Sequence, residues 1–196
     1  YGNKKINVRM AGVPVSSLDK YLNTAVEDYG WTVVVVEQEK EENKIERYIS
    51  AVISPGTNSY SQLETNNLMV IYLEKVASLI HRGESTLFAG IAYLDSLTGK
   101  SGIIQYPHKY DVSDVIIYDE ILKLITIYNP SEIIIYADKC EKSEPNIIDQ
   151  FHLNMRNYQI YIDKLPSNFS KRDYQVDIFN NIYNKLDPSS SKKDPS

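Results

Sequence analysis

The order of the patterned segments after residue 66 constrains the fold of this chain more than any other feature. Three strand-like segments come first, over 67–75, 87–96 and 100–107, and a Leu97-Thr98-Gly99 turn joins the last two into a hairpin. The patterns of a helix, a strand, a helix, a strand and a final helix follow over 113–128, 132–137, 146–155, 159–163 and 171–185. This order predicts a mixed α/β fold, in which helices pack against a sheet whose first three strands are antiparallel.

The first sixty residues predict a separate and smaller α/β unit. A short strand is expected over 5–10. A helix is expected over 18–29, and Ser17 can cap its first turn because the serine hydroxyl accepts an orphan backbone N–H. Gly30 is expected to end this helix in the left-handed conformation. One apolar face of the helix is formed by Leu18, Tyr21, Leu22, Ala25 and Val26.

Two strands and a linker are expected after this helix. The β-branched run over 31–36 predicts a strand buried on both faces, and 38–44 is typical of a charged turn. The alternation over 45–53 predicts a paired strand, which Pro55-Gly56 ends. Asn, Ser, Gln and Thr dominate the segment that follows, so a linker is expected there. The expected parts of the chain are domains over 1–60 and 66–186 and a disordered Ser/Lys/Pro-rich tail over 187–196.

The composition limits the classes of protein that fit. A chain of 196 residues with 42% hydrophobic residues suits one large or two small domains. The single cysteine, Cys140, excludes an internal disulfide and fits a reducing, intracellular compartment. No apolar run approaches the roughly 20 residues of a membrane span. The net charge is -5, and residues 1–57 hold seven basic and eight acidic residues, so any contact with nucleic acid must use locally placed cations.

Four short motifs stand in a fixed order in the first 57 residues. They are Met10-Ala11-Gly12-Val13-Pro14, Leu18-Asp19-Lys20-Tyr21-Leu22, Glu37-Gln38 and Ser54-Pro55-Gly56-Thr57. In this order they resemble the mismatch-recognition domain of the MutS family of DNA mismatch-repair proteins. The hairpin over 89–99 is similar to one in the connector domain of the same family, and the order of elements after residue 66 is similar to that of a ribonuclease-H-like sheet.

The resemblance implies a small α/β mismatch-recognition domain followed by a ribonuclease-H-like connector domain. It also implies a fragment, because the chain opens at Tyr1 and contains neither the family's Phe-x-Glu motif nor a G-x-x-x-x-G-K-[ST] phosphate-binding loop. The parent protein is expected to bind mismatched or distorted double-stranded DNA and to be a DNA-dependent ATPase, with ATP and Mg held outside this chain. The fragment itself is expected to be non-catalytic and to hold no cofactor and no metal.

The same resemblance implies the partners of the protein. We expect a MutS-like homodimer or heterodimer formed through domains outside this chain, and no association with a membrane. The alternative is a connector or interaction module that docks a repair partner such as MutL and does not bind DNA. Exposed Tyr or Ile clusters on the second domain would favour that alternative.

The resemblance also gives four candidate DNA-binding residues, Lys5, Arg9, Met10 and Arg47. Met10 matches a methionine beside the mismatch in the minor groove, where apolar side chains unstack base steps; packing in the core is the alternative. Arg9 and Lys5 would reach phosphates or lie on a solvated strand edge. Arg47 matches a basic residue of the last strand in the family's domain. A further arginine of that strand is replaced here by Ala51, which predicts weaker binding.

A ribonuclease-H-like sheet raises the alternative of a metal-dependent nuclease. Such enzymes hold two Mg²⁺ ions with clustered carboxylates, one of which normally lies centrally in the first strand. The segment 68–73 contains no acid, so Asp95, Glu120 and Asp138 are more simply strand-end and helix-surface acids. Metal-ligand spacing is also lacking among Cys140 and the three histidines, His81, His108 and His152.

Overall fold

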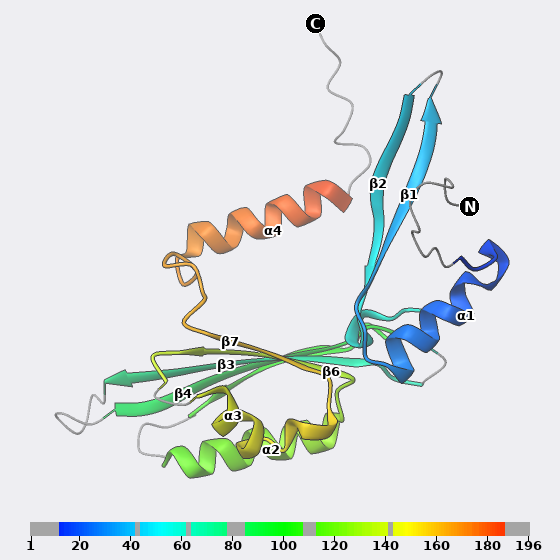
Figure 1. The fold of residues 1–196 in the computed structure, drawn as a ribbon. Helices are drawn as coiled ribbons and strands as arrows, with labels where there is room; N and C mark the ends of the chain where they lie inside the picture. Colours follow the sequence, from blue (N-terminus) through cyan, green and yellow to red (C-terminus); the bar gives the residue numbers. More distant parts are fainter. Residues whose placement is uncertain are drawn as a thin grey trace, which may run out of the picture. The chain divides into compact units, whose positions relative to one another are not determined.

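The computed structural model shows a mixed α/β chain with two sheets (Figure 1). The residues that it describes are 12–41, 44–61, 64–77, 85–107, 113–140 and 143–186. Residues 1–162 form one compact unit and residues 163–196 another. The strand expected over 5–10 and the tail expected over 187–196 lie outside the described residues. The domain boundaries expected at residues 60, 66 and 186 stay predictions.

The first helix is shorter and less regular than the sequence indicates. A 3₁₀ turn precedes α1 (Leu18–Asn23), which widens into a π-helical turn at Thr24–Asp28. Ser17 stands at the N-cap but makes no side-chain capping bond, so that prediction is wrong. The preceding turn already satisfies the start of the helix, because the Leu18 N–H donates to the Val15 carbonyl.

The apolar face of this helix reaches the core only in part. Leu22 and Val26 are buried, whereas Leu18 and Tyr21 are 38% and 51% exposed. Gly30 ends the helical segment as predicted. Its φ of 66° lies in the left-handed region, and its N–H donates to the Val26 carbonyl at 3.1 Å.

Two long strands form a separate antiparallel ribbon, β1 (Val33–Glu41) and β2 (Lys44–Ile53). The prediction that β1 is buried on both faces is wrong. Val33 and Val35 pack on the small core of Leu22, Val26 and Ile53, whereas the residues between and beyond them are exposed. The charged turn expected over 38–44 is also wrong in its bounds, because β1 extends to Glu41 and β2 begins at Lys44. Cross-strand pairing extends the ribbon beyond the part that a core covers, so charge there does not mark a turn.

The second sheet has five strands in the order β5-β4-β3-β6-β7. Strands β3, β4 and β5 pair antiparallel, and β3, β6 and β7 pair parallel. The order of elements after residue 66 is confirmed, with the two parallel connections made by α2 and by α3 plus a 3₁₀ turn. The bounds are β3 Asn67–Ala77, β4 Ser85–Asp95, β5 Ser101–Tyr106, α2 Asp114–Tyr128, β6 Glu132–Asp138, α3 Glu144–Gln150, the 3₁₀ turn Leu153–Met155 and β7 Tyr158–Ile162.

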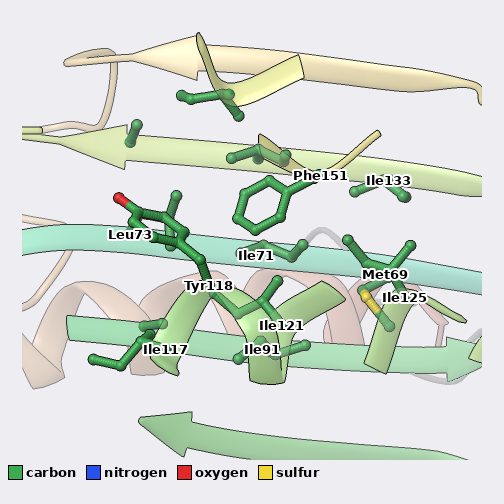
Figure 2. Packing of buried hydrophobic residues seen from close by; sticks show 14 of the residues in the cluster. Met69, Ile71, Leu73, Ile91, Ile117, Tyr118, Ile121, Ile125, Ile133 and Phe151 are labelled. Atoms are coloured by element: carbon green, nitrogen blue, oxygen red, sulfur yellow. The ribbon is translucent and has the colours of Figure 1, made fainter. Parts of the chain in front are cut away.

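The main core lies between this sheet and the helices on one of its faces (Figures 1 and 2). Alternate residues of β3 point into it, as the two-residue period of a strand requires. The buried side chains of α2 fall on one face of the helix at positions i, i+1, i+4 and i+8, namely Ile117, Tyr118, Ile121 and Ile125. Fully buried members of this core include Met69, Ile71, Leu73, Ile117, Ile121, Ile125, Ile133 and Phe151.

The described part of the unit over 163–196 includes α4 (Arg172–Leu186), which confirms the helix predicted over 171–185. Its side chains Ile178, Phe179 and Ile182 are 40%, 58% and 49% exposed. In the described part of the chain, no helix is long and apolar enough to cross a membrane.

Candidate nucleic-acid interface

The ribbon of β1 and β2 has two chemically different faces. Its inner half packs one face on the small core and leaves the other in solvent. Successive side chains of a strand alternate between faces, and cross-strand partners share a face. The solvent-facing side, called the open face, therefore consists of Val34, Val36, Gln38, Lys40, Ile45, Arg47, Ile49 and Val52.

A β-bulge at Ser50 decides which β2 residues belong to the open face. Val35 pairs with Ala51 and Val36 with Ile49, so Ser50 is the extra residue between them. Without the bulge, simple alternation from Ala51 would place Ile49 on the face of the small core. With it, the outer half of β2 is turned over, and Arg47 lies opposite Gln38 on the open face.

The result is a separation of charge between the two faces. Among the described side chains of the open face, Lys40 and Arg47 are charged and none is acidic. The opposite face of the outer ribbon carries Glu37, Glu39 and Glu46. The Tyr48 hydroxyl donates to Glu37 Oε2 at 3.0 Å on that face, and this bond raises the pKa of Tyr48.

The open face is also apolar to an unusual degree for a solvated surface. Five of its side chains are branched aliphatics that are 52% to 64% exposed, namely Val34, Val36, Ile45, Ile49 and Val52. Contiguous exposed apolar surface commonly marks a contact with another molecule. Together with the two cations, this composition suits a polyanion that also offers apolar surface, as the grooves of duplex DNA do.

Only one predicted site residue can be placed in this geometry. Arg47 lies on the open face with its side chain exposed. Met10, Arg9 and Lys5 lie outside the described residues, so their roles stay predictions. Ala51 is half-buried on the small core, on the side away from Arg47. Sequence reasoning missed Lys40, because the segment around it was interpreted as a turn.

The base of the ribbon is held by the Ser54-Pro55-Gly56-Thr57 motif. It forms a 3₁₀ turn over Pro55–Thr57, in which the Ser54 N–H donates to Thr57 Oγ1 at 2.9 Å. The turn lies against Glu132, the first residue of β6. A Cβ on Gly56 would stand 2.9 Å from Glu132 Cβ and 2.9 Å from Leu68 Cδ1, so glycine is required by space.

Two of the three acids considered for a nuclease, Asp95 and Asp138, lie at opposite ends of the main sheet, and the third, Glu120, lies on α2. Asp95 pairs with Asn67 at one end of β3, and Asp138 is opposite Glu74 near the other. Seven strand residues separate these positions, about 23 Å at the usual rise, so the two carboxylates cannot share a metal ion. Within the described residues, no group of three or more His, Cys, Asp or Glu is placed to hold a metal.

Each of these acids has a local partner. Asp95 accepts hydrogen bonds from the Thr98 hydroxyl and from the Asn66 N–H, and these bonds lower its pKa. Glu120 Oε2 accepts from the Tyr106 hydroxyl at 3.5 Å. Asp138 is 3.2 Å from Lys139 Nζ.

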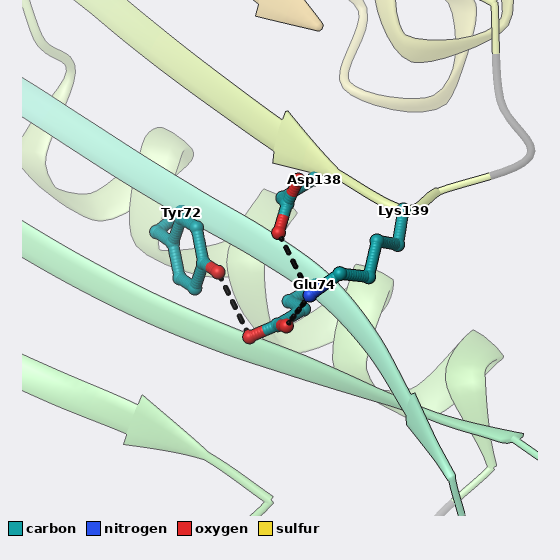
Figure 3. A network of polar contacts seen from close by, with 4 residues as sticks. All are labelled: Tyr72, Glu74, Asp138 and Lys139. Carbon is teal, nitrogen blue, oxygen red and sulfur yellow. Dashed lines mark hydrogen bonds and ion pairs between the residues drawn. The ribbon is translucent and has the colours of Figure 1, made fainter. Parts of the chain in front are cut away.

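Lys139 forms the centre of a small polar network at that end of the sheet. Its ammonium also donates to Glu74 at 2.8 Å (Figure 3). The bond from Lys139 lowers the pKa of Glu74, and burial together with a 2.8 Å bond to Glu74 raises the pKa of Tyr72. His152 is exposed, whereas His81 and His108 lie outside the described residues.

These features define an α/β chain with a mixed five-stranded sheet and a two-stranded ribbon, one face of which carries two cations and, among its described side chains, no carboxylate. Residues 1–62 match the family model of MutS domain I. This match and the curated relatives described next support a MutS-family DNA mismatch-repair protein.

Several curated relatives carry this family name. A mutS homologue of Acanthamoeba polyphaga mimivirus is 26% identical over 190 residues, 88% of this chain and 16% of that protein. MutS 1 of Haloarcula marismortui is 34% identical over 125 residues, 64% of this chain and 12% of that protein. MutS of Macrococcus caseolyticus is 28% identical over 162 residues, 78% of this chain and 17% of that protein. The chain thus spans less than a fifth of the length of each of these relatives.

Proposed function

We propose that this chain is the part of a MutS-family protein that meets mismatched or otherwise distorted duplex DNA, and that it does so through the open face of the ribbon. The observation that carries the proposal is the separation of charge across β1 and β2. Lys40 and Arg47 share a face with no described acid, while Glu37, Glu39 and Glu46 lie on the other.

Electrostatics determines which face of the ribbon can approach DNA. The chain has a net charge of -5, so its overall field repels a polyanion, and binding depends on local cations. If the ribbon approached DNA with its acidic face, three carboxylates would meet phosphates. With the open face, two cations meet phosphates, and the exposed Val and Ile side chains meet the sugars and base edges of a widened groove.

The remaining activities belong to the parent protein in this proposal. The five-stranded sheet acts as a ribonuclease-H-like connector, and this chain is non-catalytic. ATP and Mg²⁺ are bound by a domain outside it, as are the contacts of a homodimer or heterodimer. Docking of a MutL-like protein through the connector is compatible with the same arrangement.

The test is binding of the 196-residue chain to mismatched, perfectly paired and branched duplexes at one fixed, moderate salt concentration. Arg47→Gln and Glu46→Gln form a matched pair, because each removes one charge from opposite faces at neighbouring positions of β2. We expect Arg47→Gln to weaken binding and to reduce the slope of log K against log salt by roughly 0.9, the value for one phosphate contact. Glu46→Gln should change the affinity little.

Two results would count against the proposal. Equal and opposite effects of the two substitutions would mean that only net charge matters and that neither face is preferred. Absence of binding to any of the duplexes would exclude DNA recognition by this chain alone.

A further inference from the structure

The ribbon and the five-stranded sheet have separate apolar cores. One is the large core of the sheet and its helices, and the other is the small cluster of Leu22, Val26 and Ile53 with its neighbours. The turn after β2 joins the two, because Gly56 packs against Leu68 and hydrogen bonds link the turn to Glu132 and Asn66. Hydrogen bonds depend on direction, so these bonds restrict the angle between ribbon and sheet.

Glu132 is the centre of these contacts on one side. It is only 4% exposed. Its Oε2 accepts from the Ser54 hydroxyl and, at 3.1 Å, from the Gly56 N–H at the base of the ribbon. Its Oε1 accepts from the Gln159 amide of β7 at 3.0 Å. One carboxylate therefore joins the turn after β2 to two neighbouring strands of the sheet.

A cavity of about 290 Å³ lies beside this carboxylate, lined by Gly30, Thr32, Pro55, Glu132, Arg156, Asn157, Tyr158 and Gln159. Side chains leave this side of the junction partly open, so the angle there depends on the direct contacts of the turn with Glu132 and Leu68. A second contact lies at Asn66, whose amide donates to the carbonyls of Pro55 at 2.9 Å and Asn58 at 3.2 Å. Asn66 and Glu132 thus hold the same turn from two points.

We propose that Glu132 is a positioning residue, whose carboxylate fixes the orientation of the ribbon on the five-stranded sheet and thereby the direction in which the open face is presented. Its relevance to DNA rests on the proposed function, but its effect on orientation does not. A buried carboxylate with three donors is costly to disturb, because removal of the acceptor leaves the Gly56 N–H unpaired.

The experiment measures orientation directly and without DNA. Spin labels are attached to the ribbon through Glu46→Cys and to α2 through Ile127→Cys, in a Cys140→Ser background. Both labelled positions are exposed. Pulsed dipolar spectroscopy then gives the distribution of distances between the labels. For the protein with Glu132 intact we expect a single narrow distribution.

The variants are Glu132→Ala, Glu132→Gln and a matched control, Glu74→Ala. Glu74 is also a hydrogen-bonded carboxylate of the same sheet, but it lies at the far end of β3 beside Lys139. We expect Glu132→Ala to broaden and shift the distribution. Glu132→Gln should restore part of the narrow distribution because it keeps one acceptor oxygen. The control should leave the distribution unchanged.

Circular dichroism establishes that each variant is folded before labelling, and Ser54→Ala, which removes a single donor, replaces Glu132→Ala if that variant does not fold. An unchanged distribution in the folded Glu132 variant would overturn the proposal, as would equal broadening in the Glu74 control. Duplex binding is measured on the same samples. Broadening without any change in binding would support the positioning role and show that the orientation of the ribbon does not limit binding by its open face, whereas absence of binding in every sample would contradict the proposed function alone.

Discussion

At the scale of single residues, Gly56 is a position at which the surrounding atoms leave room only for glycine. The turn brings its backbone so close to Glu132 and Leu68 that a methyl group would overlap both. We expect Gly56→Ala to lower the free energy of unfolding by about 1–3 kcal/mol, as overpacking usually does. Urea denaturation measures the change. Gly12→Ala is the control, because nothing lies within 4 Å of a Cβ at that position.

The hydrogen bonds of Asp95 predict how the stability of the protein changes at acidic pH. Its pKa is lowered from 3.8, first by the Thr98 hydroxyl and then by the Asn66 N–H, because both bonds favour the ionised form. The stability that it contributes is present at neutral pH and is lost as the pH falls below 3.8 through the folded-state pKa. We expect Asp95→Asn to be less stable than the parent at pH 7 and the gap to narrow in acid. Thermal melts from pH 7 to pH 2 test this, and a constant gap would contradict it.

Residue roles at the junction could not be predicted from the sequence. Glu132 follows Ser131 and begins a hydrophobic run, as many strand-end acids do. Its importance comes from a turn 76 residues earlier in the chain, Gly56. Spacing and residue type carry no record of such a distant contact. Arg47 could be predicted, because it matches a basic residue of the last strand in the family's domain, but the face of the ribbon on which it lies could not.

At the scale of elements, alternation predicted strands well where one face is buried. The strand over 45–53 was predictable because apolar and polar residues alternate and Pro55-Gly56 follows, and the strand over 67–75 because residues 68–73 are a short continuous apolar run. The prediction that the strand over 31–36 is buried on both faces was wrong, because the β-branched residues on the open face have the same sequence pattern as a second buried face. The prediction of a turn over 38–44 was wrong because the outer ribbon packs on no core. Its strands therefore carry no apolar pattern from which pairing could be predicted.

The bulge at Ser50 gives an element-scale prediction. Deleting Ser50 would make the ladder regular while keeping Gln38 opposite Arg47, since Ser50 is the unpaired residue. Deleting Val36 from the partner strand would instead turn the outer half of β1 over and place Glu37 on the open face. We expect the first deletion to retain duplex binding and the second to lose it. Cross-strand NOEs between residues 38 and 47 report the pairing, and loss of that pairing in the Ser50 deletion would contradict this prediction.

At the scale of the whole molecule, two cores of unequal size predict unequal protection. The centre of β3 is paired on both sides and lies over the large core, whereas the outer ribbon beyond Val36 is in water on both faces. Opening of the outer ribbon therefore costs little of the global free energy. We expect its amides to exchange fastest among the strands and those of Met69 to Leu73 slowest. Hydrogen exchange read by NMR tests the order, and uniform protection would indicate one cooperative unit.

The contact between Glu132 and the turn at Gly56 also affects the order in which parts of the chain are positioned during synthesis. During synthesis the ribbon is complete at Ile53, but the residue that orients it is added 79 positions later. At ordinary translation rates this interval is roughly 4 to 16 s. During this interval the ribbon is supported by a small core of three buried side chains, Ile53 of β2 and Leu22 and Val26 of the preceding helical segment. The part of the chain that is made first is thus oriented last.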